Sequence, residues 1–214
     1  MIKIAPSLLA ADIANLESQI KMVENAGAEY LHLDIMDAHF VPNLSFGPCV
    51  IESIRKHSKM VYDVHLMMEN PIDYIDPFAK AGADIITFHV EAKSNLDDCI
   101  NKIHSHNIKA GIVIKPDTDV KEFEEYYDKV EMVLVMSVYP GFGGQKFMPE
   151  VLEKVTYIRE KMGKDFDIEI DGGVGPANAE AIIKAGANVL VAGSAVFGAE
   201  NPSEVIKAMK SYEK

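Results

Sequence analysis

Cysteine is scarce in this sequence. Only Cys49 and Cys99 are present, and they form no spacing pattern. Two such thiols provide no disulfide framework and are typical of a reducing compartment. The chain runs directly into Ile2-Lys3-Ile4 without an apolar signal core, and no apolar stretch approaches the length that spans a membrane. We therefore expect a cytoplasmic protein with no membrane partner.

Basic residues are also in short supply. The chain has 21 Lys and Arg against 33 Asp and Glu, which gives a net charge of −12. Proteins that bind nucleic acid or anionic membranes need a basic surface, so the charge balance argues against both partners. A small phosphorylated substrate remains possible, because backbone amides and a metal ion can bind an anion at a closed site on an acidic protein.

The sequence has no linker, low-complexity stretch or break in composition. Its 214 residues, with 48% hydrophobic and 25% charged residues, are ordinary for a globular protein. A domain of this length buries roughly 70% of its unfolded surface and needs no structural metal or disulfide. We expect a single catalytic domain over residues 1–214.

Eight short apolar runs rich in β-branched residues recur along the chain. They are Ile2 to Pro6, Tyr30 to Ile35, Met60 to Leu66, Asp84 to Val90, Lys109 to Ile114, Met132 to Val138, Asp167 to Ile170 and Val189 to Ala192. Segments with a 3.6-residue period separate them, as in Leu152, Val155, Ile158 and Met162. This alternation predicts βαβ units and a parallel sheet.

A repeated tripeptide supports a regular architecture. Ala-Gly-Ala occurs at 26–28, 81–83 and 185–187, each time between a helical stretch and a strand. Glycine at such a joint can adopt the left-handed conformation that ends a helix. We interpret the three copies as one αβ joint used repeatedly.

Eight units in one α/β domain predict a closed (β/α)₈ TIM barrel, at the small end of the range for this fold. The alternative is an open doubly wound sheet. The glycine-rich fingerprint of that fold is missing after the first strand, where Ala5-Pro6-Ser7-Leu8-Leu9 stands instead. The barrel is the better prediction.

Polar side chains occur near the ends of several predicted strands, where the active site of such a barrel is built. His32 and Asp34 are two residues apart, so both point to the same face of their strand. His65 and Asp171 lie near the ends of two other strands. Each could be a buried polar group satisfied by hydrogen bonds, but together they suit Zn²⁺, Fe²⁺, Mn²⁺ or Co²⁺. The other five histidines, at 39, 57, 89, 104 and 106, are not expected to be ligands.

Glycine-rich turns follow the last three predicted strands. They contain Pro140-Gly141-Phe142-Gly143-Gly144, then Gly172-Gly173, then Gly193-Ser194. Their backbone amides can converge on a phosphate, and a short helix starting near Ser194 would add its dipole. Glycine is common in tight turns anyway, so only the three together favour a phosphate site.

Three methionines, Met36, Met67 and Met136, are predicted to lie just past strand ends. They are either ordinary core filling or a soft apolar lid over the metal, and the sequence leaves both interpretations open.

Several motifs together strongly resemble the ribulose-phosphate 3-epimerase family, over essentially the whole chain and in order. They are Ile4-Ala5-Pro6-Ser7-Leu8-Leu9, Leu31-His32-Leu33-Asp34-Ile35-Met36-Asp37, His39-Phe40-Val41-Pro42-Asn43, Asp63-Val64-His65-Leu66-Met67, Pro140-Gly141-Phe142-Gly143-Gly144-Gln145 and Asp171-Gly172-Gly173-Val174.

The resemblance implies an isomerase that epimerises ketose phosphates in the pentose phosphate pathway. It implies one divalent metal held by His32, Asp34, His65 and Asp171, with Asp34 and Asp171 also acting as the catalytic acid/base pair. Met36, Met67 and Met136 match the family's methionines over the metal. The implied substrate contacts are Ser7, His65, Gly141, Phe142, Gly143, Gly144, Asp171, Gly172, Gly173, Gly193 and Ser194. Family members are often homo-oligomers, either dimers or hexamers.

The sequence departs from the family pattern at three places. Ala38 replaces a usual glycine, Tyr139 precedes Pro140 where many relatives have asparagine or glutamate, and Lys115 replaces an asparagine common in bacterial members. None is a proposed ligand, but sugar specificity stays open, because related enzymes epimerise allulose 6-phosphate. Two other hypotheses are a Schiff-base aldolase that uses Lys115 and a non-catalytic sugar-phosphate binder.

Overall fold

The computed structural model describes residues 1–212 and contains eight parallel strands in one sheet. The strands are β1 (Lys3–Pro6), β2 (Tyr30–Met36), β3 (Val61–Met67), β4 (Ile85–His89), β5 (Lys109–Ile114), β6 (Met132–Met136), β7 (Asp167–Asp171) and β8 (Val189–Ala192). All eight predicted strands are therefore present. Met36 and Met67, which we expected just past strand ends, are instead the last residues of β2 and β3. β6 ends at Met136, two residues before the end of the predicted run.

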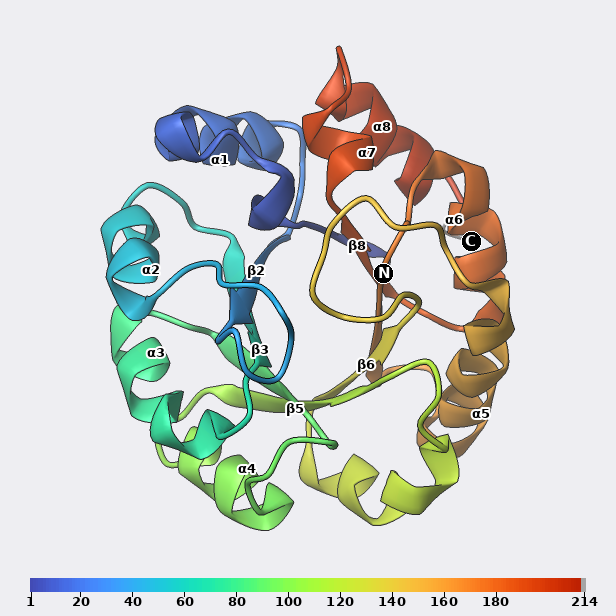
Figure 1. Cartoon of the computed structure of the whole chain (residues 1–214). Helices are drawn as coiled ribbons and strands as arrows, with labels where there is room; N and C mark the ends of the chain where they lie inside the picture. The colour runs from blue at the N-terminus through green and yellow to red at the C-terminus, as the bar shows by residue number, and fades with distance from the viewer. Residues whose placement is uncertain (213–214) are drawn as a thin grey trace.

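The sheet closes on itself. Its hydrogen-bonded order is β1-β8-β7-β6-β5-β4-β3-β2, and the two ends of this order meet at a parallel bridge between Ser7 and His32. Figure 1 shows the strands as an inner ring surrounded by helices. The chain is thus a single (β/α)₈ barrel, and the open doubly wound alternative is excluded.

Helices cover the outside of the ring. They are α1 (Leu16–Asn25), α2 (Pro48–Arg55), α3 (Ile75–Ala81), α4 (Leu96–His104), α5 (Leu152–Met162), α6 (Pro176–Ala185), α7 (Ser194–Phe197) and α8 (Pro202–Lys210). The crossover from β5 to β6 differs from the prediction of α-helices throughout, because Val120–Lys129 forms a 3₁₀ helix. At about 2.0 Å per residue, this conformation spans more distance with the same residues than an α-helix does. No helix in residues 1–212 is long and apolar enough to cross a membrane.

The Ala-Gly-Ala joints behave as predicted. Gly27, Gly82 and Gly186 have φ angles of 93°, 108° and 118°. Gly82 and Gly186 cap α3 and α6 in the left-handed conformation. Each glycine lets the chain leave a helix and enter the next strand within a few residues.

The strands divide their side chains between two environments. Alternate residues such as Leu31, Leu33 and Ile35 are completely buried in the large apolar core that the helices complete. The intervening residues point into the barrel, where β2 and β3 pair His32 with Asp63 and Asp34 with His65. The barrel interior is therefore polar around these four residues, although both imidazoles and Asp63 are completely buried.

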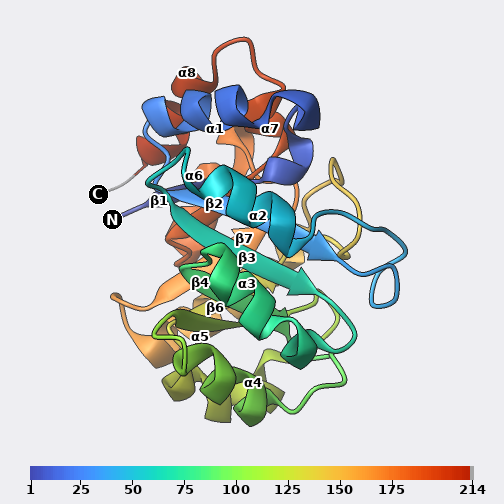
Figure 2. The ribbon, with the colours of Figure 1, turned by 90° about the vertical axis from the view of Figure 1, so that its left-hand side faces the viewer.

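The long loops gather at one end of the barrel. Figure 2 shows the loops after β2 and β6 extending beyond the carboxyl ends of the strands, while the N-terminus lies at the opposite end. The parallel arrangement thus collects the last residue of every strand at the same mouth.

Candidate active site

A cavity of about 780 Å³ opens at the mouth of the barrel. Its lining includes Asp34 and most residues that the resemblance placed against the substrate, which are Ser7, Gly141, Phe142, Gly143, Gly144, Asp171, Gly172, Gly173, Gly193 and Ser194. His65 was also placed there, but it is completely buried and is not among the lining residues. It contributes to the cavity floor from behind Asp34, whose side chain lines the cavity.

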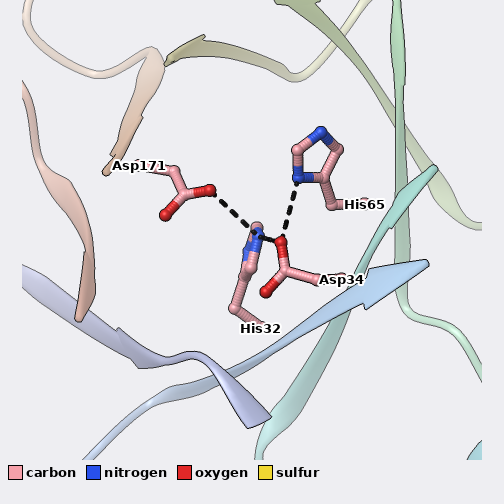
Figure 3. Close-up of side chains that lie close together, drawn as sticks. All are labelled: His32, Asp34, His65 and Asp171. Carbon is pink, nitrogen blue, oxygen red and sulfur yellow. Dashed lines mark ion pairs between the residues drawn. The ribbon is translucent and has the colours of Figure 1, made fainter. Parts of the chain in front are cut away.

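Four polar side chains meet in this floor (Figure 3). Asp34 Oδ1 lies 3.4 Å from His32 Nε2 and 3.5 Å from His65 Nδ1. Asp171 approaches from the far side of the mouth, with Oδ2 3.9 Å from His32 Nε2. One ligand atom from each of the four residues lies within 4.8 Å of the others. The predicted set is therefore brought together from β2, β3 and β7.

The donor atoms of this cluster suit a cation. His32 Nε2 and His65 Nδ1 are buried nitrogen atoms with no hydrogen-bond partner among residues 1–212. Leaving a buried polar atom unpartnered costs about 1–3 kcal/mol. Both atoms face Asp34, and two imidazoles with two carboxylates are a common donor set for divalent metals. The site is thus compatible with a divalent metal ion.

The electrostatics of the cluster separate its two carboxyl groups. Burial opposes ionisation of Asp34, but His32 and His65 hold the pKa of this carboxyl far below its ordinary value. Burial and the nearby charge of Asp34 raise the pKa of Asp171 to about 7. Burial alone would lower the pKa of His32, but Asp34 and Asp63 raise it well above its ordinary value. Near neutral pH, Asp34 is ionised while Asp171 can hold a proton.

Two buried carboxyl groups beneath the cluster are not among the predicted site residues. Asp63 Oδ2 accepts a hydrogen bond from His32 Nδ1 at 2.6 Å, and Glu169 Oε1 lies 3.5 Å from the same nitrogen. Burial and the charge of Asp63 raise the pKa of Glu169 well above its ordinary value. The hydrogen bond between His32 Nδ1 and Asp63 holds the imidazole of His32 with Nε2 toward Asp34.

The sequence does contain a signal for both of these groups. Asp63 precedes His65 by two residues and Glu169 precedes Asp171 by two, which is the spacing of His32 and Asp34. Side chains two apart on a strand share a face. Asp63 and Glu169 therefore had to point into the barrel together with the candidate ligands.

The remaining histidines lie outside the cluster, but one of them touches it. His57, His104 and His106 are partly exposed and pair with carboxylates near the surface. His39 is exposed and forms hydrogen bonds with Asp37. His89 is the completely buried last residue of β4, with Nε2 3.0 Å from His65 Nε2.

Lys115 does not line the cavity. Its ammonium group lies 4.0 Å from the centre of the Phe40 ring, in a cation–π contact. A Schiff base would need the lysine amine inside the cavity beside the carbonyl of the substrate. The aldolase hypothesis therefore has no support in the geometry.

The turn after β7 packs tightly on the loop after β6. Gly173 has a φ of 64°, and a Cβ atom added to it would lie 2.5 Å from the backbone nitrogen of Phe147. A Cβ on Gly172 would lie 2.6 Å from Val138. Glycine is thus required here for close approach as well as for conformation. The same two loops form one wall of the cavity.

The three methionines are packed in the core and also reach the cavity. Met36, Met67 and Met136 are at most 2% exposed, and all three line the cavity. Met36 and Met67 pack with Val41, and Met136 packs with Val138. They are core residues whose outer surface forms an apolar part of the cavity wall.

Ala38 occupies a backbone conformation that favours glycine. Its φ is 60°, and its N–H donates to Asn43 O at 2.9 Å across the loop after β2. For an L-residue this conformation costs roughly 1–2 kcal/mol, whereas glycine adopts it readily. We expect Ala38→Gly to raise the free energy of unfolding by up to about 1 kcal/mol, since glycine's extra freedom in the unfolded chain offsets part of the gain.

Denaturant melts test this expectation against Ala11→Gly. Ala11 has a φ of −80°, so glycine relieves no strain there and should destabilise the protein by about 0.4–1 kcal/mol. Equal destabilisation by both substitutions would contradict the strain at Ala38.

Comparison with known proteins gives a consistent result. Residues 3–197 match the model of the ribulose-phosphate 3-epimerase family. The chain is 50% identical over 212 residues to the cytoplasmic isoform of ribulose-phosphate 3-epimerase from Oryza sativa subsp. japonica, covering 97% of this chain and 92% of the relative. It is 48% identical over 214 residues to ribulose-phosphate 3-epimerase from Bacillus subtilis (strain 168), covering 98% and 99%.

Solved structures with low sequence identity share the fold. The 3-hexulose-6-phosphate synthase from Salmonella typhimurium superimposes with a TM-score of 0.73 at 15% identity, covering 99% of this chain and 98% of the other. At this identity the likeness shows the barrel architecture alone.

Proposed function

The chain belongs to the ribulose-phosphate 3-epimerase family, and we propose that it interconverts D-ribulose 5-phosphate and D-xylulose 5-phosphate by metal-dependent proton transfer at C3. The observation that carries this proposal is the meeting of Asp34 and Asp171 with two imidazoles in the floor of one cavity. The family makes the chain an epimerase, and therefore an isomerase. The preferred substrate and the roles of individual residues are our proposal.

His32, Asp34, His65 and Asp171 would hold one divalent ion, which we propose to be Zn²⁺, Fe²⁺, Mn²⁺ or Co²⁺. When bound, such an ion supplies Lewis-acid stabilisation of the negative charge that develops on the substrate oxygens. Support for the four ligands comes from the unpartnered ring nitrogens of His32 and His65, both of which face Asp34.

Epimerisation requires a proton to leave C3 on one face and another to arrive on the opposite face. Asp34 on β2 and Asp171 on β7 approach the cluster from different sides of the mouth. In one direction the ionised Asp34 would remove the proton to give an enediolate, and the protonated Asp171 would return one to the other face. In the reverse direction the roles exchange. The pair therefore needs one proton between its members, which agrees with the opposite shifts of their pKa values.

Ser7 supports this arrangement from β1. Its hydroxyl group is buried and donates to Asp34 Oδ2 at 2.5 Å, while Asp34 Oδ1 faces the two histidines. A hydrogen bond to a carboxylate stabilises its ionised form and limits its rotation. We propose that Ser7 holds Asp34 ready to accept the proton.

The glycine-rich turns after β6, β7 and β8 would bind the phosphate. Gly144, Gly173, Gly193 and Ser194 lie on one side of the cavity, and α7 begins at Ser194 as the sequence predicted. Backbone amides in such turns can approach an anion without interference from side chains. Phosphate binding away from C3 would orient the sugar over the two carboxylates.

Apolar groups would shield the enediolate from water. Met36, Met67 and Met136 line the cavity beside Asp34 and Asp171, and the exposed Phe142 stands in the loop after β6. Excluding water strengthens the electrostatic interactions in the site and limits stray protonation. We propose this role for the methionine cap.

We further propose that the enzyme acts in the pentose phosphate pathway of the cytosol, as a homo-oligomer such as a dimer or hexamer. The free thiols of Cys49 and Cys99 and the cytoplasmic isoform among the relatives support the location.

An NMR assay with ribulose 5-phosphate and allulose 6-phosphate, run side by side in D₂O, tests the proposed function. We expect deuterium to enter C3 of ribulose 5-phosphate as xylulose 5-phosphate forms, with the pentose phosphate preferred. Preference for the hexose phosphate would show that the proposed substrate is wrong. Binding of either sugar without deuterium exchange would instead make the protein a binder.

A further inference from the structure

A line of hydrogen bonds leaves the site through the barrel wall behind His65. His65 Nε2 lies 3.0 Å from His89 Nε2, and His89 Nδ1 lies 3.1 Å from Glu91 Oε2. Both imidazoles are completely buried, whereas the Glu91 side chain is 21% exposed. This line of hydrogen bonds runs from His65 on β3 through His89 on β4 to Glu91 in the loop after β4. The proton-transfer scheme above does not use these hydrogen bonds.

The direction of these hydrogen bonds follows from Glu91. Its Oε1 accepts from the backbone N–H of Lys115 at 2.9 Å and from the hydroxyl group of Thr118. These bonds and the one from His89 outweigh the effect of burial and hold the pKa of Glu91 at about 2. Glu91 is thus a carboxylate that only accepts, so His89 Nδ1 must be the donor to it.

The donor at His89 Nδ1 also determines the direction of the hydrogen bond between the two imidazole rings. His89 is completely buried, which favours the neutral ring, and a neutral ring that carries its hydrogen on Nδ1 leaves Nε2 as an acceptor. His65 Nε2 must then donate to His89. His65 is left with a bare Nδ1, and this is the atom that faces Asp34 Oδ1 at 3.5 Å.

We propose that Glu91, acting through His89, is a positioning residue that fixes the tautomer of His65 and so presents its Nδ1 lone pair to the metal. This inference rests on the proposed function, because it assigns a purpose to a nitrogen of the candidate metal site. His89, which the sequence did not mark as a site residue, transmits the effect. Partners of this kind behind a ligand typically matter about 10–100-fold in metal affinity.

The substitution Glu91→Gln would reverse the direction of these hydrogen bonds while keeping the shape of the side chain. A glutamine has one acceptor oxygen, and the side toward Lys115 already offers two donors, the backbone N–H and the hydroxyl group of Thr118. The amide NH₂ then faces His89 Nδ1, which must accept. Both rings change tautomer, and His65 Nδ1 acquires a hydrogen that blocks metal binding.

We expect Glu91→Gln to weaken Zn²⁺ binding by about 10–100-fold, measured by titrating metal-stripped protein against a chelating dye. Glu91→Ala should weaken binding less, because it leaves both tautomers accessible. Thermal stability should follow the opposite order, since alanine also removes the acceptors of Lys115 and Thr118. A merely structural role would give the same order in both measurements.

Glu131→Gln is the matched control. Glu131 Oε2 accepts from His104 Nε2 at 3.1 Å and from the backbone N–H of Ala110 at 2.9 Å, so it combines the same groups far from the mouth. This variant should bind Zn²⁺ as the unmodified protein does.

The outcomes separate this inference from the proposed function. No Zn²⁺ binding by the unmodified protein would overturn the metal site itself. One Zn²⁺ per chain with equal affinity in Glu91→Gln would overturn the role of Glu91 alone. ¹⁵N NMR of the metal-stripped, unmodified protein measures the tautomer directly and needs no variant to fold: His65 should carry its hydrogen on Nε2, and a hydrogen on Nδ1 would refute the proposal.

Discussion

Replacing Asp171 with asparagine is expected to lower kcat for epimerisation by at least about 10³-fold while leaving the barrel folded. Asparagine keeps the shape of the side chain but can neither hold nor accept the transferred proton, and positioned acid/base groups typically contribute about 10²–10⁴-fold. Asp171 is also one of four groups around the proposed metal, so the loss should lie at the upper end of this range. Asp34→Asn is expected to have a comparable effect. Steady-state kinetics with ribulose 5-phosphate measures both.

Isotope exchange shows whether the two carboxylates act on opposite faces. Any residual exchange of the C3 hydrogen in D₂O should be confined to one of the two epimers, because a single carboxylate remains. Asp97→Asn is a suitable control, since Asp97 is a surface residue paired with Lys129. Circular dichroism should show the same fold in all variants. Near-normal turnover by folded Asp171→Asn would contradict the two-carboxylate scheme.

Removal of the metal is expected to lower activity by at least about 100-fold, with recovery on adding Zn²⁺, Mn²⁺, Co²⁺ or Fe²⁺. Lewis-acid stabilisation supplies several kcal/mol, and about 1.4 kcal/mol corresponds to a factor of ten in rate. Elemental analysis of the active protein should find one such ion per chain. Dialysis against a strong chelator, followed by addition of one metal at a time, makes the measurement.

Thermal unfolding provides the accompanying control. An ion that binds only the folded state raises the melting temperature by an amount that grows with the logarithm of its concentration divided by its Kd. The stripped protein should therefore melt lower but still cooperatively, because the apolar core between strands and helices does not involve the site. A fully active protein containing far less than one metal ion per chain would rule out the proposed coordination.

The fold could be predicted from the sequence because its signals are local. The eight apolar runs and the helical periods between them reflect which side chains each element buries, and the Ala-Gly-Ala joints reflect the left-handed conformation of one glycine each. The errors are local as well. Strand ends shifted by one or two residues, as at Met36, since hydrogen bonding to a neighbouring strand sets where a strand stops.

The candidate site was predicted incompletely for a different reason. His32, Asp34, His65 and Asp171 stand out in apolar runs and in motifs of the family. Glu169 has the same two-residue spacing to Asp171, which indicates the face to which it points, but the spacing does not tell that Glu169 reaches His32 beneath the site. Glu91 lies beyond its strand and is linked to the site through His89.

The order of the elements, the face shared by residues two apart on a strand, and the kinds of donor atoms at the strand ends were determined by the sequence itself, because each depends on the conformation of a few neighbouring residues. Only the tertiary structure decided that Asp171 of β7 meets Asp34 of β2, and that Glu91 is linked to His65. These contacts depend on closure of the barrel between Ser7 and His32 and on the register of every strand pair between them. Closure and register belong to the packing of the whole chain, and no short segment contains them.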